Sequence, residues 1–353
     1  MMRSFRDRDH LITPEGFIFT VIGNLHPQDR VLAYLKNVPD ELGKWGHGQA
    51  RYRRALQHYN VPSVMESMNY LRSEAPGYLF ESSVHGFTLS AVPMDRIAGH
   101  LRPEERLAQL EKSQGIDELE KKVVGLAGLI SENAHVPFGS LGVSGSVLAG
   151  IHSPTFSDID LIVYGLDDAL RVKSFLQSIE KSSSDQIRRL TGISKERWIA
   201  ERIASTPLTR QDALNLLARK WNLGSFDGTA FSVHAVHTEP EVHECYGDEY
   251  YASLGMVEGT ARVTDDLEAL FMPAVYKVDP SGLRGVVTRP KVGQIVSYEG
   301  LYADIAKQGE TVVCKGEVEK VEGASGIRYR IVVGSLEAQG TDYLLPLPRL
   351  ISP

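Results

Sequence analysis

The chain has 353 residues, a length that suits two or three domains, so a function is best sought in one segment. Apolar residues make up 42% and charged residues 24% of it, which excludes a disordered or fibrous protein. The formal net charge of −7 argues against a protein that coats long duplex DNA, because such binding relies on dense Lys and Arg. A small ligand, a protein or one end of an RNA remains open as a partner.

Cysteine content and hydropathy indicate the compartment. The only two cysteines, Cys245 and Cys314, lack CxxC spacing and form no disulfide framework. The charged segment from Met1 to Arg8 is not followed by an apolar core, and no run of about 18 apolar residues occurs. We therefore expect a cytoplasmic protein without a membrane partner.

Residues 1–100 are predicted to form a β-rich N-terminal domain. Short apolar runs at residues 17–22, 31–35 and 87–92 are separated by Gly and Pro. The polar residues between them have no metal-ligand spacing and no nucleophile motif, so we interpret this segment as structural.

Residues 101–254 are predicted to form a central domain. Pro103 begins a helix whose apolar positions recur at spacings of three and four as far as Ile130. A glycine-rich segment, a short helix and a turn then lead to a strand from Asp158 to Tyr164. The remaining predicted elements are helices at 167–179 and 195–220, a loop at Ser182 to Ser184 and a strand at 230–237.

Residues 255–353 are predicted to form a small β-rich C-terminal domain, for which a barrel is one option. Short apolar runs appear among Gly and Pro, ending at residues 332–334 and 343–345. The predicted fold class is α+β.

Two carboxylates stand two residues apart on the predicted central strand. Alternate side chains leave the same face of a strand, so Asp158 and Asp160 can share a metal site while Ile159 turns to the core. Transfer of a nucleotidyl group needs such a pair, because divalent ions neutralise the attacking and leaving oxygens.

Gly145 and Ser146 precede this strand and begin the short helix. Such a turn offers a triphosphate unencumbered backbone N–H groups and a hydroxyl. Either feature alone carries little weight in a chain with 32 glycines, whereas the joint spacing is informative.

The segment Val143-Ser144-Gly145-Ser146, eleven residues and then Asp158-Ile159-Asp160-Leu161 resembles the signature of the DNA polymerase beta-type nucleotidyltransferase superfamily. The resemblance covers about residues 137–236. It implies a central minimal nucleotidyltransferase fold, a mixed sheet with helices, flanked by the two β-rich domains. It also implies that Gly145 and Ser146 hold the phosphates of an NTP, with ATP favoured, and that Asp158 and Asp160 bind Mg²⁺ or Mn²⁺. The layout looks like archaeal nucleotidyltransferase-domain proteins of unassigned activity.

The chain departs from the superfamily pattern at the third carboxylate, which active members usually carry on a later strand. The run from Phe231 to Val236 contains none. Asp227 and His234 are the candidates to replace it as a base or ligand. The alternatives are a turn at Asp227-Gly228 and an ordinary core or surface histidine at His234.

Arg219 and Lys220, on the helices after the motif, are candidates for phosphate contact. The alternative is a solvated helix face, since acidic residues are interleaved among the basic ones.

We expect a metal-dependent nucleotidyltransferase that moves a nucleoside monophosphate from an NTP to an acceptor hydroxyl on RNA, protein or a small molecule, releasing pyrophosphate. The alternative is a nucleotide-sensing or RNA-binding module whose catalytic activity has lapsed. A further carboxylate beside Asp158 and Asp160 would favour the enzyme. An empty or histidine-filled position would favour the module that only binds.

Overall fold

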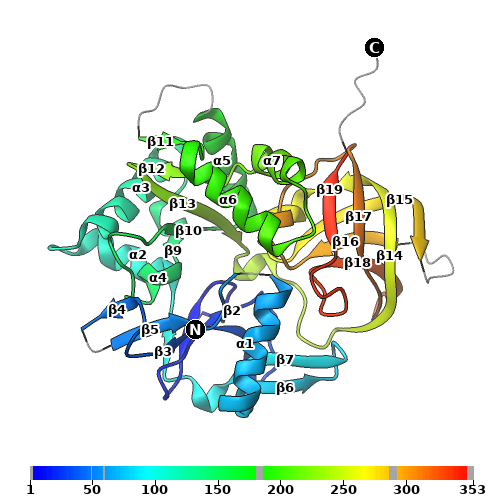
Figure 1. Ribbon diagram of the computed structural model, residues 1–353, viewed down its shortest axis with the longest axis horizontal. Helices are drawn as coiled ribbons and strands as arrows, with labels where there is room; N and C mark the ends of the chain where they lie inside the picture. The colour runs from blue at the N-terminus through cyan, green and yellow to red at the C-terminus, as the bar shows by residue number, and fades with distance from the viewer. Residues whose placement is uncertain (1–2, 49, 59, 180–185, 286–291, 348–353) are drawn as a thin grey trace.

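The computed structural model describes residues 3–48, 50–58, 60–179, 186–285 and 292–347, and the loop expected at Ser182 to Ser184 lies outside them. Three sheets follow one another along the chain and, with the helices, give an α+β protein. Figure 1 shows the N-terminal unit in blue to cyan, the central unit in teal and green, and the C-terminal unit in yellow to red. None of the described helices has the length and apolar character needed to cross a membrane.

The N-terminal unit is an antiparallel sheet with one α-helix. Its strands are β1 (His10–Ile12), β2 (Ile18–Val21), β3 (Arg30–Pro39), β4 (Trp45–His47), β5 (Ala50–Arg54), β6 (Leu79–Ser82), β7 (Phe87–Pro93) and β8 (Gly99–Leu101). The main path runs β4-β5-β3-β2-β1-β8, and β7 pairs with β3 and β6. The helix α1 (Val61–Glu74) lies in a segment where no helix was predicted, and the Asn60 side chain caps it by accepting from the Ser63 N–H.

The first three strands present two different faces. Leu11, Phe19 and Leu35 are fully buried in the core of the unit. His10 and Thr20, which pair across β1 and β2, take the opposite face, because neighbouring residues of a strand point to opposite sides. This second face carries polar side chains together with apolar ones such as Ile18.

Strand β3 contains a β-bulge at Lys36. Phe19 pairs with Leu35 and Ile18 pairs with Asn37, so Lys36 is the additional residue of β3. A bulge of this kind changes the direction of a side chain and is frequent beside functional sites.

The central unit is a mixed five-stranded sheet with the order β11-β12-β13-β10-β9. Its strands are β9 (Leu141–Val143), β10 (Ile159–Tyr164), β11 (Ile187–Arg188), β12 (Leu223–Phe226) and β13 (Thr229–Val236). Its helices are α2 (Pro103–Lys112), α3 (Glu118–Ala134), α4 (Gly145–Leu148) and α5 (Leu166–Ser178). Strands β10 and β13 are parallel, while the other neighbours pair antiparallel.

Two long helices predicted from the sequence are each interrupted. The helix expected from Pro103 ends at Lys112, and α3 begins after Asp117, which forms a capping box with Glu120. The helix expected at 195–220 is divided into α6 (Gly192–Ser205) and α7 (Arg210–Arg219), and Thr209 caps α7. The apolar periodicity continues across both breaks, which is why it predicts uninterrupted helices.

One face of the central sheet is buried with α3 and α5. Leu161 and Val163 of β10 and Val233 of β13 share a core with these helices. By the alternation of side chains, Asp160 and Ser232 point to the opposite face. On that opposite face, the polar residues Asp160 and Ser232 share the sheet with a small buried apolar cluster of Ile162, Tyr164 and Val236.

The C-terminal unit is a closed barrel. Its strands are β14 (Glu249–Asp265), β15 (Ala274–Gly285), β16 (Val292–Ser297), β17 (Thr311–Gly323), β18 (Gly326–Val333) and β19 (Tyr343–Pro346). The path β14-β15-β16-β18-β17 returns to β14, because β14 pairs with both β15 and β17. The barrel begins at Glu249, ahead of the expected boundary at residue 255.

Helices α6 and α7 belong with the barrel. Trp198 and Ile199 of α6 and Leu216 of α7 are buried in the same core as the barrel strands. Figure 1 shows both helices extending from the central unit towards the C-terminal one. The core of the C-terminal unit therefore includes residues that the sequence placed in the central domain.

Candidate functional site

Gly145 and Asp160 are in direct contact. Gly145 has a φ of +65°, and a Cβ atom there would lie 2.2 Å from Asp160 Oδ2. The Ser144 N–H also donates to the Asp160 carbonyl oxygen at 2.8 Å. Only glycine combines this backbone angle with so close an approach. The fold thus brings together the two halves of the sequence motif.

The two aspartates form a repulsive pair. Asp158 is exposed immediately before β10, so the predicted strand begins one residue later than expected, and Asp160 is the second residue of β10. The negative charge of Asp160, with desolvation as the second cause, raises the pKa of Asp158 to about 6. Carboxylate oxygens are ligands that Mg²⁺ prefers, so the pair fits Mg²⁺ or Mn²⁺.

Ser146 lies half-buried on α4, directly after Gly145. Among the residues that the structure describes, its hydroxyl has no hydrogen-bond partner. That hydroxyl is therefore available to a ligand.

A serine occupies the position opposite Asp160. In the parallel pair β10 and β13, Asp160 is aligned with Ser232, whose Oγ donates to Asp160 Oδ1 at 2.6 Å. His234 Nε2 lies 2.9 Å from the same Ser232 Oγ. Since Ser232 gives its single hydrogen to a carboxylate, Nε2 carries the hydrogen and donates to Ser232. The position opposite Asp160, where a third carboxylate was expected, thus holds the Ser232 hydroxyl, which is hydrogen-bonded to His234. We call it the third position.

His234 is held neutral. Burial, with the nearby positive charges of Arg8, Lys220 and Lys36, lowers the pKa of His234 well below its ordinary value. With the hydrogen on Nε2, Nδ1 is the basic nitrogen of a neutral imidazole. His234 therefore has the chemistry of a base or a metal ligand, as the sequence suggested, although Ser232 stands between it and Asp160.

The structure does not bring Asp227 to the aspartate pair. Asp227 and Gly228 form the two-residue turn between β12 and β13, with φ angles of 45° and 78°. Asp227 is exposed there, and Ser232 lies five residues further along β13, a separation of roughly 16 Å at 3.3 Å per residue. The strand does not start earlier and the loop does not fold inward, so Asp227 has the role of a turn residue.

Arg219 and Lys220 connect the central unit to the barrel. Arg219 pairs with Glu310 at 2.7 Å, and Lys220 Nζ donates to the carbonyl oxygens of Gly300 and Ala303 at 2.8 and 2.6 Å. Lys220 is only 4% exposed, and burial lowers its pKa to about 7. These contacts give both side chains a structural role between the two units, and the predicted phosphate contact stays a prediction.

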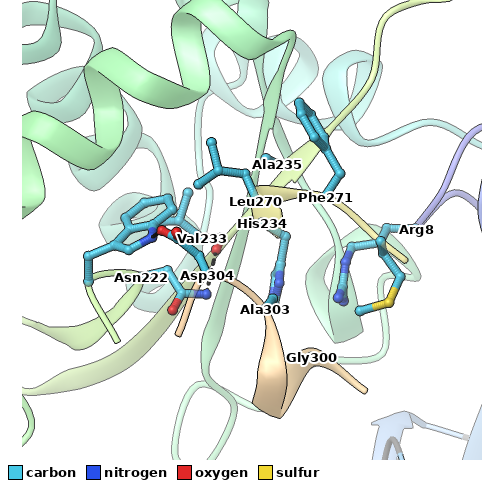
Figure 2. Close-up of a pocket in the computed structure, with 12 residues that line it drawn as sticks. Arg8, Asn222, Val233, His234, Ala235, Leu270, Phe271, Gly300, Ala303 and Asp304 are labelled. Carbon is cyan, nitrogen blue, oxygen red and sulfur yellow. Dashed lines mark hydrogen bonds between the residues drawn. The ribbon is translucent and has the colours of Figure 1, made fainter. Parts of the chain in front are cut away.

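A small hollow lies where the three units meet (Figure 2). It has a volume of about 20 Å³, and its lining includes Arg8, His234, Gly300 and Asp304. A space of this size admits about one water molecule. His234 therefore extends from Ser232, beside Asp160, to a position that a water can reach.

A second group of residues has the composition of a metal site. Ligand atoms of Asp117, Glu120 and His152 all lie within 4.8 Å of one another. However, Asp117 Oδ1 caps α3, His152 Nε2 bonds to Asp117 Oδ2 at 2.9 Å, and Arg106 bonds to Glu120 Oε1 at 2.7 Å. Protein donors already hold the acidic oxygens, so we interpret this group as a helix cap.

The sequence did not identify the N-terminal residues beside the aspartate pair. The Ser144 hydroxyl donates to the Arg8 carbonyl oxygen at 2.9 Å, which ties the N-terminal segment to the glycine turn. The positive charges of Arg54 and Lys36 act on Asp158 and oppose the rise of its pKa. Arg8, Lys36 and Arg54 lie on three different segments, so no spacing within one segment indicated them.

The fold and the site define a three-unit α+β protein with paired aspartates at the start of β10 in its central sheet. The chain is 30% identical over 346 residues to the uncharacterized protein MJ1086 of Methanocaldococcus jannaschii, a match that covers 96% of this chain and 98% of that protein. The chain belongs to the same family as MJ1086. No family model matches the chain, and no solved structure matches it.

Proposed function

We propose that this protein binds a nucleoside triphosphate together with a divalent cation at Gly145, Ser146, Asp158 and Asp160. The contact of Gly145 with the Asp160 carboxylate is the observation that carries the proposal. It unites the glycine turn and the Asp-x-Asp strand, as the resemblance to the polymerase beta-type superfamily implies. Asp158 and Asp160 would hold Mg²⁺ or Mn²⁺, and ATP is the first triphosphate to test.

The group at the third position determines whether a bound nucleotide reacts. Nucleotidyl transfer needs an acceptor hydroxyl to lose its proton, and a third carboxylate normally helps to hold the metal that assists this step. Ser232 is a neutral hydroxyl, and its hydrogen is already given to Asp160. We therefore favour a nucleotide-sensing module that binds without efficient transfer.

Transfer to an acceptor is the second candidate, and the neutral state of His234 supports it. Its Nδ1 is unprotonated at neutral pH and can accept a proton, and its Nε2 is linked through Ser232 to Asp160. In this version the imidazole would take the proton of an acceptor hydroxyl on RNA, protein or a small molecule.

One experiment separates these functions. Equilibrium binding of each NTP with Mg²⁺ or Mn²⁺, and transfer of α-phosphate label to RNA, to protein or to the chain itself, are measured for the parent and for Asp158→Asn/Asp160→Asn. The expected result is metal-dependent binding that the variant loses, without transferred label. Label that depends on both aspartates would establish the transferase. Equal NTP affinities of parent and variant would overturn both functions.

A further inference from the structure

We propose that the second face of the N-terminal sheet, formed by His10, Thr20 and Lys36 with Arg8 beside it, binds the phosphate groups of the ligand. For the identity of that ligand, a nucleoside triphosphate, the inference rests on the proposed function. The anion site itself rests on separate observations in the N-terminal unit.

This face lies against the glycine turn. Ile18, on the same face of β2 as Thr20, packs with Ile151 at the end of the segment that begins at Gly145. The Arg8 carbonyl accepts from the Ser144 hydroxyl at 2.9 Å. This second face of the N-terminal sheet, called the N-terminal wall below, thus lies beside the phosphate-binding turn proposed above.

Several polar groups on this wall are buried without hydrogen-bond partners. His10 is 0% exposed, and neither of its ring nitrogens has a hydrogen-bond partner among the described residues. Thr20 Oγ1 is buried and likewise lacks one in the described part of the chain, whereas Arg8 Nε makes no hydrogen bond there but lies 3.5 Å from Asp7 Oδ2 in an ion pair. Buried polar groups are nearly always paired, so the unpartnered His10 and Thr20 on neighbouring strands point to a polar ligand.

The charges on this wall select an anion. Burial lowers the pKa of His10 well below its ordinary value, and the positive charges of Lys36 and Arg8 contribute. The ring is therefore a neutral hydrogen-bond donor between two cations. Asp7 is paired with Arg8, so the attraction for an anion comes chiefly from the Lys36 ammonium, and a phosphate oxygen could accept from it, from His10 and from Thr20.

The bulge in β3 explains how Lys36 takes part. Lys36 is the additional residue of the strand, so its side chain does not follow the regular alternation of the other side chains of β3. Its positive charge acts on Asp158, His10 and His234, so it lies among the motif, the N-terminal wall and β13. A triphosphate that extends from a metal ion held by Asp158 would come close to the Lys36 ammonium group.

The test uses the full chain and inorganic tripolyphosphate, which carries the phosphate chemistry without a base or sugar. Thermal shift and calorimetry without metal are expected to show binding to the parent and to Asp158→Asn/Asp160→Asn. Lys36→Met is expected to weaken tripolyphosphate binding by roughly ten-fold or more, the value of one charge-assisted hydrogen bond. Arg53→Met is the matched control, because Arg53 is 44% exposed on β5 and pairs with Asp40.

Thr20→Val separates a ligand contact from a structural role. The Thr20 hydroxyl has no hydrogen-bond partner in the described residues, so its removal is expected to leave the melting temperature unchanged or raise it while tripolyphosphate affinity falls. Equal tripolyphosphate affinities for Lys36→Met and Arg53→Met would overturn the inference even if the aspartates bind Mg·ATP. Conversely, Mg·ATP binding that ignores the aspartates would remove the proposed function and leave the anion site standing.

Discussion

Ser232 stands directly opposite Asp160 in the parallel strands β10 and β13 and donates a hydrogen bond of 2.6 Å to its carboxylate. This pairing gives the aspartate site two carboxylates and one hydroxyl. It sets the charge that a bound cation meets and the groups available to an acceptor.

Ser232→Asp is predicted to create a third carboxylate at the site. Without metal, the melting temperature should fall, because three negative groups would lie close together. Mg²⁺ or Mn²⁺ should restore it, with a larger metal-induced rise than in the parent. Ser232→Asn is the neutral control of similar size, and metal-induced rises of equal size in the two variants would contradict the geometry.

Gly145→Ala is predicted to destabilise the protein and to abolish nucleotide binding. The left-handed backbone alone costs roughly 1 to 2 kcal/mol for a residue with a Cβ, and the clash with Asp160 adds to this. Gly150→Ala is a matched control, because Gly150 has a φ of +66° and open space around its Cβ position. Chemical denaturation should show the greater loss for Gly145→Ala, and equal losses would argue against the Gly145 contact.

The effect of Mg²⁺ on stability is predicted to depend on pH. Folding raises the pKa of Asp158 from about 3.9 in the unfolded chain to about 6. Its protonated form therefore stabilises the fold fully below about pH 3.9, and this contribution is lost as pH rises through about 6. A divalent cation binds the deprotonated pair and compensates for the loss. The metal-induced rise in melting temperature should therefore be larger at pH 7.5 than at pH 5. Asp158→Asn should flatten this dependence, and a pH-independent rise in the parent would refute it.

Lys220→Met is predicted to reduce stability without changing nucleotide affinity. The substitution leaves the carbonyl oxygens of Gly300 and Ala303 without their donor, at a cost of about 1 to 3 kcal/mol. Arg197→Met, an exposed position on α6, serves as the control. Denaturation and NTP titration should separate the two properties, and a selective loss of NTP affinity in Lys220→Met would return this lysine to the phosphate site.

The sequence motif predicted the contact of the glycine turn with Asp160 but not the group opposite it. Spacing within a segment located Gly145, Asp158 and Asp160 near one another. The identity of the third group depended on the register of β10 with β13, two strands separated by α5, α6 and α7. Such long-range register leaves no local pattern, and this is why the sequence suggested Asp227 and not Ser232.

The N-terminal unit was underestimated for two different reasons. Helix α1 had a visible signal, with Asn60 as cap, Pro62 in the first turn and Val64, Met68 and Leu71 on one side. The N-terminal wall had none, because His10, Thr20 and Lys36 lie on three strands and only sheet pairing gathers them. Scattered polar residues in a β-rich segment therefore gave no reason to assign them to a site.

The shared core of α6, α7 and the barrel has a mechanical consequence. The chain passes from α7 through Trp221, whose Nε1 donates to Asp304 Oδ2, and two residues later enters β12, which pairs with β13. The strand that carries Ser232 and His234 is thus anchored, close to its hairpin partner, in the C-terminal unit. A chain shortened to residues 1–248 would lose the surface on which α6 and α7 fold. We therefore expect the part of the sheet that carries the aspartate pair to unfold together with the barrel.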